Sequence, residues 1–157
     1  MNIRPLEKKD TPEVAQLIHA TWYTHADIES GFLRKEYLES IDIDYYLRLC
    51  FGSDTNFMFV AEENGKIIGC CRVEIQEAEP VLVSDRLAYI HDIIVDEDFQ
   101  RHHVATALLE TIETFVKKDL KIHLIKSRVY TFNTAATGLF EKRHYKDLYS
   151  EFYKKLD

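Results

Sequence analysis

The chain contains little glycine, proline or cysteine: five Gly, three Pro and three Cys among 157 residues. It has no Gly-rich GxxxxGK[ST] or GxGxxG run, which disfavours a P-loop or Rossmann nucleotide binder. Its cysteines, Cys50, Cys70 and Cys71, are odd in number, and no pair has the spacing of a zinc finger. We therefore expect a reducing, cytoplasmic setting and no bound metal.

Long apolar runs and an excess of positive charge are also missing. No apolar run is long enough to span a bilayer, and residues 1–5 do not resemble a signal peptide. The 20 Lys and Arg against 27 Asp and Glu give a formal net charge of -7. This balance argues against a nucleic-acid binder and is compatible with a cationic partner. We expect neither a nucleic acid nor a membrane as a partner.

The residues that are present fit one globular domain over 1–157, with 46% hydrophobic and 30% charged residues. Thr11 followed by Pro12 predicts a helix start, and Asn64-Gly65 between two apolar stretches predicts a hairpin. The remaining pattern predicts strands at 2–5, 57–61, 66–75, 87–95, 122–130 and 145–155, helices from 11 and at 34–49, 101–118 and 134–143, and a loop at 23–33. This order predicts an α/β or α+β fold, with a sheet covered by helices.

One stretch carries the clearest functional signal. An apolar strand at 90–95 runs through an acidic turn into a helix whose first residues are Arg101, His102 and His103. A helix start has unpaired backbone N–H groups and the positive end of the helix dipole, and both attract anions. The stretch therefore predicts a phosphate-binding site.

Two motifs extend this interpretation. Residues 100–105, Gln-Arg-His-His-Val-Ala, resemble the pattern Gln/Arg-x-x-Gly-x-Gly/Ala, and residues 133–145 resemble Asn-x-x-Ala-x-x-Leu-Tyr-x-x-x-Gly-Phe. With the order of strands and helices, they make the chain resemble the GNAT N-acyltransferase superfamily. The resemblance implies a mixed, mostly antiparallel sheet of about six to seven strands with about four flanking helices.

The resemblance also implies acetyl-CoA as the acyl donor. The amides of 101–106 would bind its pyrophosphate, and 93–95 would pair with the pantetheine arm as a strand does. The cofactor-binding residues it implies are Ile93, Ile94, Val95, Gln100, Arg101, His102, His103, Val104, Ala105, Thr106, Asn133, Ala136 and Phe140.

The chain departs from the family pattern at three positions. His103 and His144 stand where the motifs have Gly, and Phe140 stands where Tyr is frequent. We expect a helical φ at His103, which does not require Gly, and a left-handed conformation at His144, which His tolerates at some cost. Phe140 has no proton to give to the leaving thiolate, which leaves the ammonium product, a water, Tyr130 or Tyr145 as the source.

Three residues are candidates for the general base that deprotonates the attacking amine. Alternation along the strand predicts that Tyr89, His91 and Ile93 face one way and Asp92 the other. His91 is preferred, because related arylalkylamine acetyltransferases have His at this position and His titrates near neutral pH. Asp92 is the rival if a bulge shifts the register, and Glu74 on the neighbouring strand is the third. A purely structural role for His91 stays open.

The sequence thus favours an N-acetyltransferase that passes an acetyl group to a small cationic amine by direct attack in a ternary complex. Acetylation of a protein N-terminus or lysine is the first alternative. A degenerate acyl-CoA-binding sensor without turnover is the second, since the motifs lack both glycines and the Tyr. A homodimer is open as well, because C-terminal strands are often exchanged or paired in this family.

Overall fold

A computed structural model describes residues 1–156, so Asp157, the last residue of the predicted domain, lies outside the described part. One sheet has the strand order β1-β2-β3-β4-β5, in which β1 to β4 are antiparallel and β5 runs parallel to β4. The strands are β1 (Asn2–Pro5), β2 (Asn56–Glu63), β3 (Lys66–Glu77), β4 (Arg86–Val95) and β5 (Ile125–Ser127). The helices are α1 (Thr11–Ile28), α2 (Lys35–Leu38), α3 (Ile43–Arg48), α4 (Val104–Lys118) and α5 (Thr134–Lys142), with 3-10 turns η1 (Lys8–Asp10) and η2 (Glu97–Phe99).

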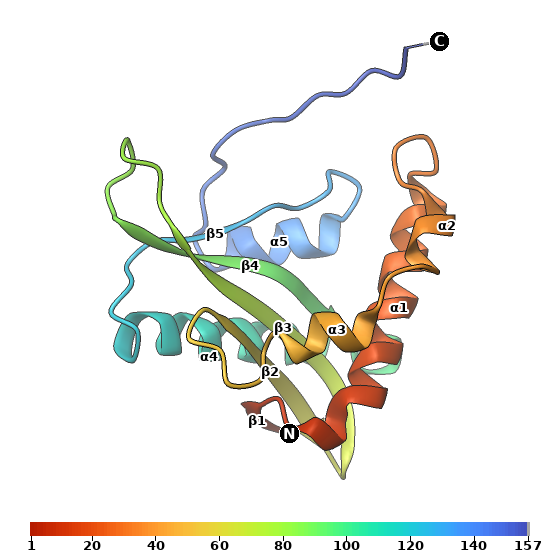
Figure 1. Ribbon diagram of the computed structural model, residues 1–157, viewed down its shortest axis with the longest axis horizontal. Helices are drawn as coiled ribbons and strands as arrows, with labels where there is room; N and C mark the ends of the chain where they lie inside the picture. The colour runs from red at the N-terminus through yellow and green to blue at the C-terminus, as the bar shows by residue number, and fades with distance from the viewer. Residues whose placement is uncertain (157) are drawn as a thin grey trace.

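Helices cover both faces of the sheet (Figure 1). On one face, Leu108 and Ile112 of α4 and Phe140 of α5 pack against Val73 and Ile90 of the sheet. We call this the α4 face. On the other face, which we call the α1 face, α1 and α3 bury a second apolar cluster. Its fully or nearly fully buried members are Val14, Ile18, Leu47, Met58, Val60, Ile67, Cys70 and Ile94.

Local sequence signals account for the element boundaries that agree with the prediction. Asn64 and Gly65 have φ of 52° and 80°, the left-handed values that a two-residue hairpin turn requires. Pro12 lies in the first turn of α1, just after the buried Asp10. Arg4 of β1 holds the Asp10 carboxylate through two hydrogen bonds of 2.7 and 2.9 Å, which fixes the start of α1 against the sheet. The same hydrogen bonds hold the pKa of Asp10 below its usual range.

The helices differ from the prediction in three places. The helix predicted at 34–49 is two short helices, because Asp42 accepts a hydrogen bond from Tyr45 N at 2.7 Å and starts α3 anew. Helix α1 continues to Ile28, so 23–28 is helical rather than loop. Helix α4 begins at Val104 instead of 101. The Asp42 cap decides the break between α2 and α3, and apolar periodicity cannot indicate such a cap.

The sheet is smaller than predicted. It has five strands in the described residues, where about six to seven were expected. The predicted strand at 122–130 shrinks to the three residues of β5, and 145–155 contains no strand. Apolar residues in that last segment, such as Leu148 and Phe152, are exposed, so their pattern alone did not determine pairing.

Gly69 of β3 allows the close approach of β4 and α4. A Cβ atom at this position would lie 2.8 Å from the Ile94 carbonyl oxygen and 3.2 Å from Val104. Since the nearest atom belongs to the backbone, it cannot swing away as a flexible side chain would.

We expect Gly69→Ala to lower the free energy of unfolding by about 1–3 kcal/mol through overpacking. Gly138→Ala is the matched control, because a Cβ there would meet nothing within 4 Å. In the helix α5 this control should stabilise the protein by about 0.5–1 kcal/mol. Urea denaturation of both variants measures the difference, and equal effects would contradict this account.

Candidate active site

A bulge in β4 determines where the three candidate bases point. Arg72 of β3 pairs with Asp92 and Val73 pairs with Ile90, so His91 is an extra residue in β4. Such a bulge interrupts the alternation of side chains. His91 and Asp92 therefore both face the α1 side, and the predicted placement of Asp92 opposite His91 is wrong. Ile93 packs on the α4 face and Ile94 on the α1 face.

Strand β4 has a free edge beyond this bulge. It pairs with β5 at Ala88, Tyr89 and Ile90, and Ser127 Oγ, at the end of β5, donates to the Ile90 carbonyl at 3.1 Å. Within the described residues, no strand pairs with 93–95 on this side. Unpaired strand-edge groups are the ones that an extended, amide-bearing ligand satisfies.

His91 and Glu74 form a pair at the bulge. His91 Nε2 lies 2.6 Å from Glu74 Oε2, and both side chains are about a third exposed. Gln76 Nε2 also donates to Glu74, at 3.2 Å. Burial raises the pKa of Glu74, but the hydrogen bonds from His91 and Gln76 and the nearby charges outweigh it and bring the pKa below its usual range. Glu74 is thus a charged partner for the His91 imidazole at neutral pH.

Asp92 is held much more tightly. Trp22 Nε1 of α1 donates to Asp92 Oδ1 at 3.1 Å, and the Tyr46 hydroxyl of α3 donates to Oδ2. Burial, followed by the charge of Asp92, raises the pKa of Tyr46 well above its usual range, so Tyr46 keeps its proton. Asp92 is therefore a structural link between β4 and the helices of the α1 face.

Sequence reasoning missed the partners of this link. The Arg72 guanidinium lies 4.2 Å from the centre of the Tyr46 ring, and its Nη2 donates to Asn56 Oδ1 at 2.6 Å. Arg72 is only 5% exposed. An Arg inside the apolar run of β3 was the available signal, because a charge is rarely buried without partners.

The start of α4 keeps the geometry of an anion site but not the expected backbone at His103. His103 is the N-cap, with φ 62° and ψ 12°, so the expectation of a helical φ there is wrong. This left-handed conformation is the one that Gly adopts without cost. The first hydrogen bond of the helix joins Ala107 N to the His103 carbonyl at 3.0 Å. The amides of 104–106 precede it and are the unpaired donors of the helix start.

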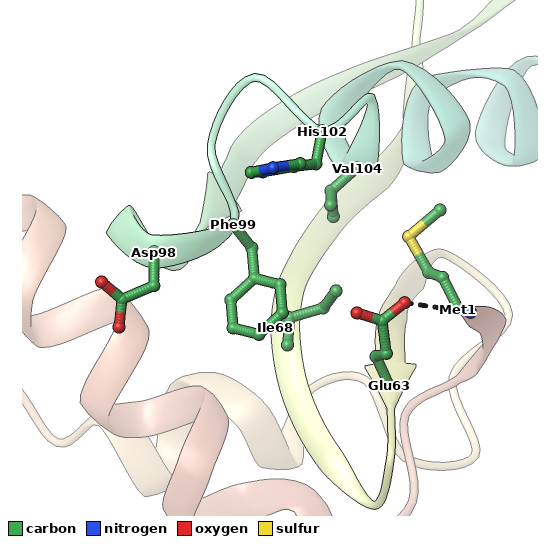
Figure 2. Close-up of a pocket in the computed structure, with 7 residues that line it drawn as sticks. All are labelled: Met1, Glu63, Ile68, Asp98, Phe99, His102 and Val104. Carbon is green, nitrogen blue, oxygen red and sulfur yellow. Dashed lines mark ion pairs between the residues drawn. The ribbon is translucent and has the colours of Figure 1, made fainter.

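A hollow of about 330 Å³ lies beside this helix start (Figure 2). It is lined by Met1, Glu63, Ile68, Asp98, Phe99, His102 and Val104. The N-terminal amine of Met1 pairs with Glu63 at 3.3 Å. With the carboxylates of Glu63 and Asp98 at its border, the hollow itself does not suit a phosphate.

The second motif forms the start of α5. Asn133 is its N-cap, and its Oδ1 accepts a hydrogen bond from Ala136 N at 3.1 Å, which leaves the side-chain amide nitrogen to donate elsewhere. Phe140 is only 7% exposed and packs edge-on against Tyr145, with ring centres 4.9 Å apart. His144 has the left-handed φ of 64° expected for it.

The remaining site predictions concern metals and membranes. Among residues 1–156, no group of three or more His, Cys, Asp or Glu is placed to hold a metal ion. None of the helices in the described part of the chain is long and apolar enough to cross a membrane. The thiols of Cys70 and Cys71 are buried, which raises the pKa of each well above its usual range.

The free edge of β4 and the helix start both follow the bulge along the chain, and together they make up the candidate site. The family model described as the Acetyltransferase (GNAT) family matches residues 14–145. The chain therefore belongs to the GNAT acetyltransferase family, as the two motifs predicted. No curated protein matches it.

Solved structures share this fold at low sequence identity. A tetramutant of the BH1408 protein from Bacillus halodurans has a TM-score of 0.86 and 19% identity, over 99% of this chain and 100% of that one. An aminoglycoside acetyltransferase, meta-AAC0020, from an uncultured soil metagenomic sample has a TM-score of 0.69 and 21% identity, over 99% of this chain and 96% of that one. Aminoglycoside N-acetyltransferase AAC(6')-Iy, solved in complex with CoA, has a TM-score of 0.73 and 17% identity, over 98% of this chain and 93% of that one.

We expect His103→Gly to raise the free energy of unfolding by up to about 1 kcal/mol, because Gly removes the strain of a left-handed residue. The same change should alter the affinity for CoA, since the bulk and any charge of the imidazole disappear beside the amides of 104–106. His144→Gly is the matched control, since His144 has nearly the same φ at the far end of α5. It should give a similar gain in urea denaturation with unchanged CoA affinity by calorimetry. A change in CoA affinity for both variants would contradict this placement of the anion site.

Proposed function

We propose that this acyltransferase passes an acetyl group from acetyl-CoA to a small cationic amine, by direct attack in a ternary complex. The observation that carries the proposal is the His91–Glu74 pair, at 2.6 Å, placed at the bulge where the free edge of β4 begins. A base and its carboxylate partner thus stand next to backbone groups that can hold an extended acyl donor.

The residues of the donor side fit acetyl-CoA. The free edge at 93–95 suits the amides of the pantetheine arm, and the amides of 104–106 suit the pyrophosphate. Asn133 retains a side-chain donor at the start of α5. Acetyl-CoA supplies an activated thioester carbonyl, and a backbone N–H near Ile93 is our candidate for the group that stabilises the negative charge on its oxygen.

The acceptor side favours a cation. Glu74 and Asp92 both lie on the α1 face of the sheet, and the chain carries a formal net charge of -7. Negative charge around a site raises the local concentration of a cationic ligand. The aminoglycosides named for two structural neighbours are polycationic amines, and they belong in the first panel of acceptors.

In our mechanism His91 takes a proton from the bound ammonium, and Glu74 stabilises the imidazolium that results. The neutral amine then attacks the thioester carbonyl, the carbon–sulfur bond breaks, and CoA leaves as a thiolate. Asp92 is a weaker candidate for the base, because two donors from Trp22 and Tyr46 already occupy its oxygens.

The thiolate takes its proton from the ammonium product, a water or a Tyr. Tyr145 is the weaker of the two Tyr candidates, because its hydroxyl is buried and burial raises its pKa well above the usual range. Tyr130 is 37% exposed and follows the end of β5 by only three residues. Since a thiol has a pKa of about 8.5, a dedicated acid adds little at neutral pH.

Thiol release from acetyl-CoA with a panel of amines tests the function. The panel should contain polyamines, arylamines, aminoglycosides and peptides, and we expect the fastest release with a small cationic amine. Fastest release with peptides would favour the alternative of a protein N-terminal or lysine acetyltransferase. Binding of acetyl-CoA without thiol release for any amine would favour the sensor.

His91→Ala should lower kcat by about 100-fold or more at neutral pH if His91 is the base. Glu74→Gln should lower kcat less, because glutamine keeps a hydrogen-bond acceptor for His91 and removes only the negative charge that stabilises the imidazolium. The pKa of Glu74 lies below its usual range, so in the unmodified protein this carboxylate loses its charge only at acid pH.

His123→Ala is the matched control, since His123 is exposed and precedes β5. Its profile should equal that of the unmodified protein. An unchanged pH–rate profile in His91→Ala would assign His91 a structural role instead.

We also propose that the protein is a homodimer through the segment 146–156. The segment exposes Leu148, Tyr149, Phe152 and Leu156, and Phe152 is 91% exposed. Apolar side chains concentrated in this way mark an interaction surface. Light scattering should give the mass of two chains, and Phe152→Ser should reduce it to one. A monomeric mass for the unmodified chain would exclude the dimer.

A further inference from the structure

Three aromatic side chains join α1 to the segment between β5 and α5. The His25 ring of α1 lies edge-on to Tyr130 at 5.7 Å and to Phe132 at 5.5 Å, measured between ring centres. Tyr130 and Phe132 are stacked on each other, 5.1 Å apart and only 7° from parallel. We call these residues the aromatic bridge. The segment between β5 and α5 turns toward α1 (Figure 1).

The aromatic bridge connects the acceptor side to the donor side of the site. Trp22 lies one helical turn before His25 on α1, and its indole is bonded to Asp92 at the bulge. At the other end of the bridge, Phe132 is followed directly by Asn133, the residue that starts α5. The aromatic bridge therefore lies between Trp22, the α1 partner of Asp92, and Asn133 at the start of α5.

The chemistry of the aromatic bridge suits an amine that also carries a flat apolar group. Stacked rings present a flat apolar surface, and their faces also attract cations. Burial lowers the pKa of His25, although the charge of Asp92 partly opposes this, so His25 is neutral and does not repel an ammonium group. Tyr130 is accessible from solvent, so a ligand can reach the rings without unfolding the site.

We propose that His25, Tyr130 and Phe132 form the gate of the acceptor site and select amines in which the amino group is attached to a flat apolar group. The ring of such an amine replaces the contact between His25 and the stacked pair when the gate opens. Its ammonium group then lies toward His91, Glu74 and Asp92. This inference rests on the proposed function, because it names the acceptor class of the same site.

The test compares phenethylamine with n-butylamine, which has the same charge and no ring. We expect Phe132→Ala and Tyr130→Ala each to raise KM for phenethylamine about tenfold, as loss of an aromatic contact does. In Phe132→Ala the KM for n-butylamine should change by less than about twofold, and so should the KM for acetyl-CoA. Tyr130→Phe keeps the ring and should retain the preference for phenethylamine.

Tyr45→Ala is the control for a general loss of aromatic surface. Tyr45 is 58% exposed on α3 and stacks on Arg48, away from the aromatic bridge. The substitution Tyr45→Ala should leave the KM for phenethylamine and for n-butylamine unchanged. Equal rises in KM for the two amines in Phe132→Ala, or no rise in either, would overturn the gate. Thermal unfolding of each variant identifies those that have lost the fold.

Calorimetric titration with phenethylamine in the presence of CoA separates the gate from the proposed function, because it needs no turnover. Tight binding that weakens about tenfold in Phe132→Ala supports the gate even if no thiol is released. In that case the proposed acetyl transfer fails and the acceptor gate stands. If the unmodified protein turns over other amines but does not bind phenethylamine, the gate fails and the proposed function stands. If phenethylamine neither binds nor reacts, the gate is wrong whatever the other amines do.

Discussion

The extra residue in β4 determines the geometry of the whole site. Because Arg72 pairs with Asp92 and Val73 with Ile90, His91 has no partner of its own in β3. Its side chain and that of Asp92 consequently emerge on the same face, toward α1 and α3. Beyond the bulge the edge of β4 is free, since β5 pairs only as far as Ile90. One irregularity in a strand thus places the His91–Glu74 pair next to the free edge of β4.

The bulge is stabilised from the α1 face by buried polar groups. Trp22 and Tyr46 donate to Asp92, and Arg72 stacks on Tyr46 while it bonds to Asn56. Buried polar groups of this kind are costly to leave unpaired, so each member depends on the others. Two residues that are adjacent in sequence therefore have different surroundings, because Asp92 is enclosed by donors and His91 remains open to solvent.

The start of α4 shows that a motif can keep the backbone conformation of its glycine after losing the glycine. His103 adopts the left-handed backbone that Gly would adopt, and the amides of 104–106 keep their place at the helix start. The cost of a left-handed His is about 1 kcal/mol, small against the stability of a domain. At Gly69, by contrast, glycine cannot be replaced without strain, because the backbone of β4 lies too close for any side chain.

The sequence by itself determined the parts that depend on neighbours along the chain. These are the Asn64-Gly65 hairpin, the apolar stripe of α4, and the two motifs that placed the chain in the GNAT family. Local backbone preferences and periodicity act over a few residues, so they can be recognised in one sequence.

Only the tertiary structure decided the bulge at His91, the donors that enclose Asp92, the left-handed His103 and the number of strands in the sheet. Each of these depends on which residues far apart in the chain are brought together. Strand register is set by packing of one face against helices, and a one-residue shift reverses the side on which every following side chain lies. Periodicity within β4 could not reveal that shift, because its cause lies in β3 and in the helices of the α1 face.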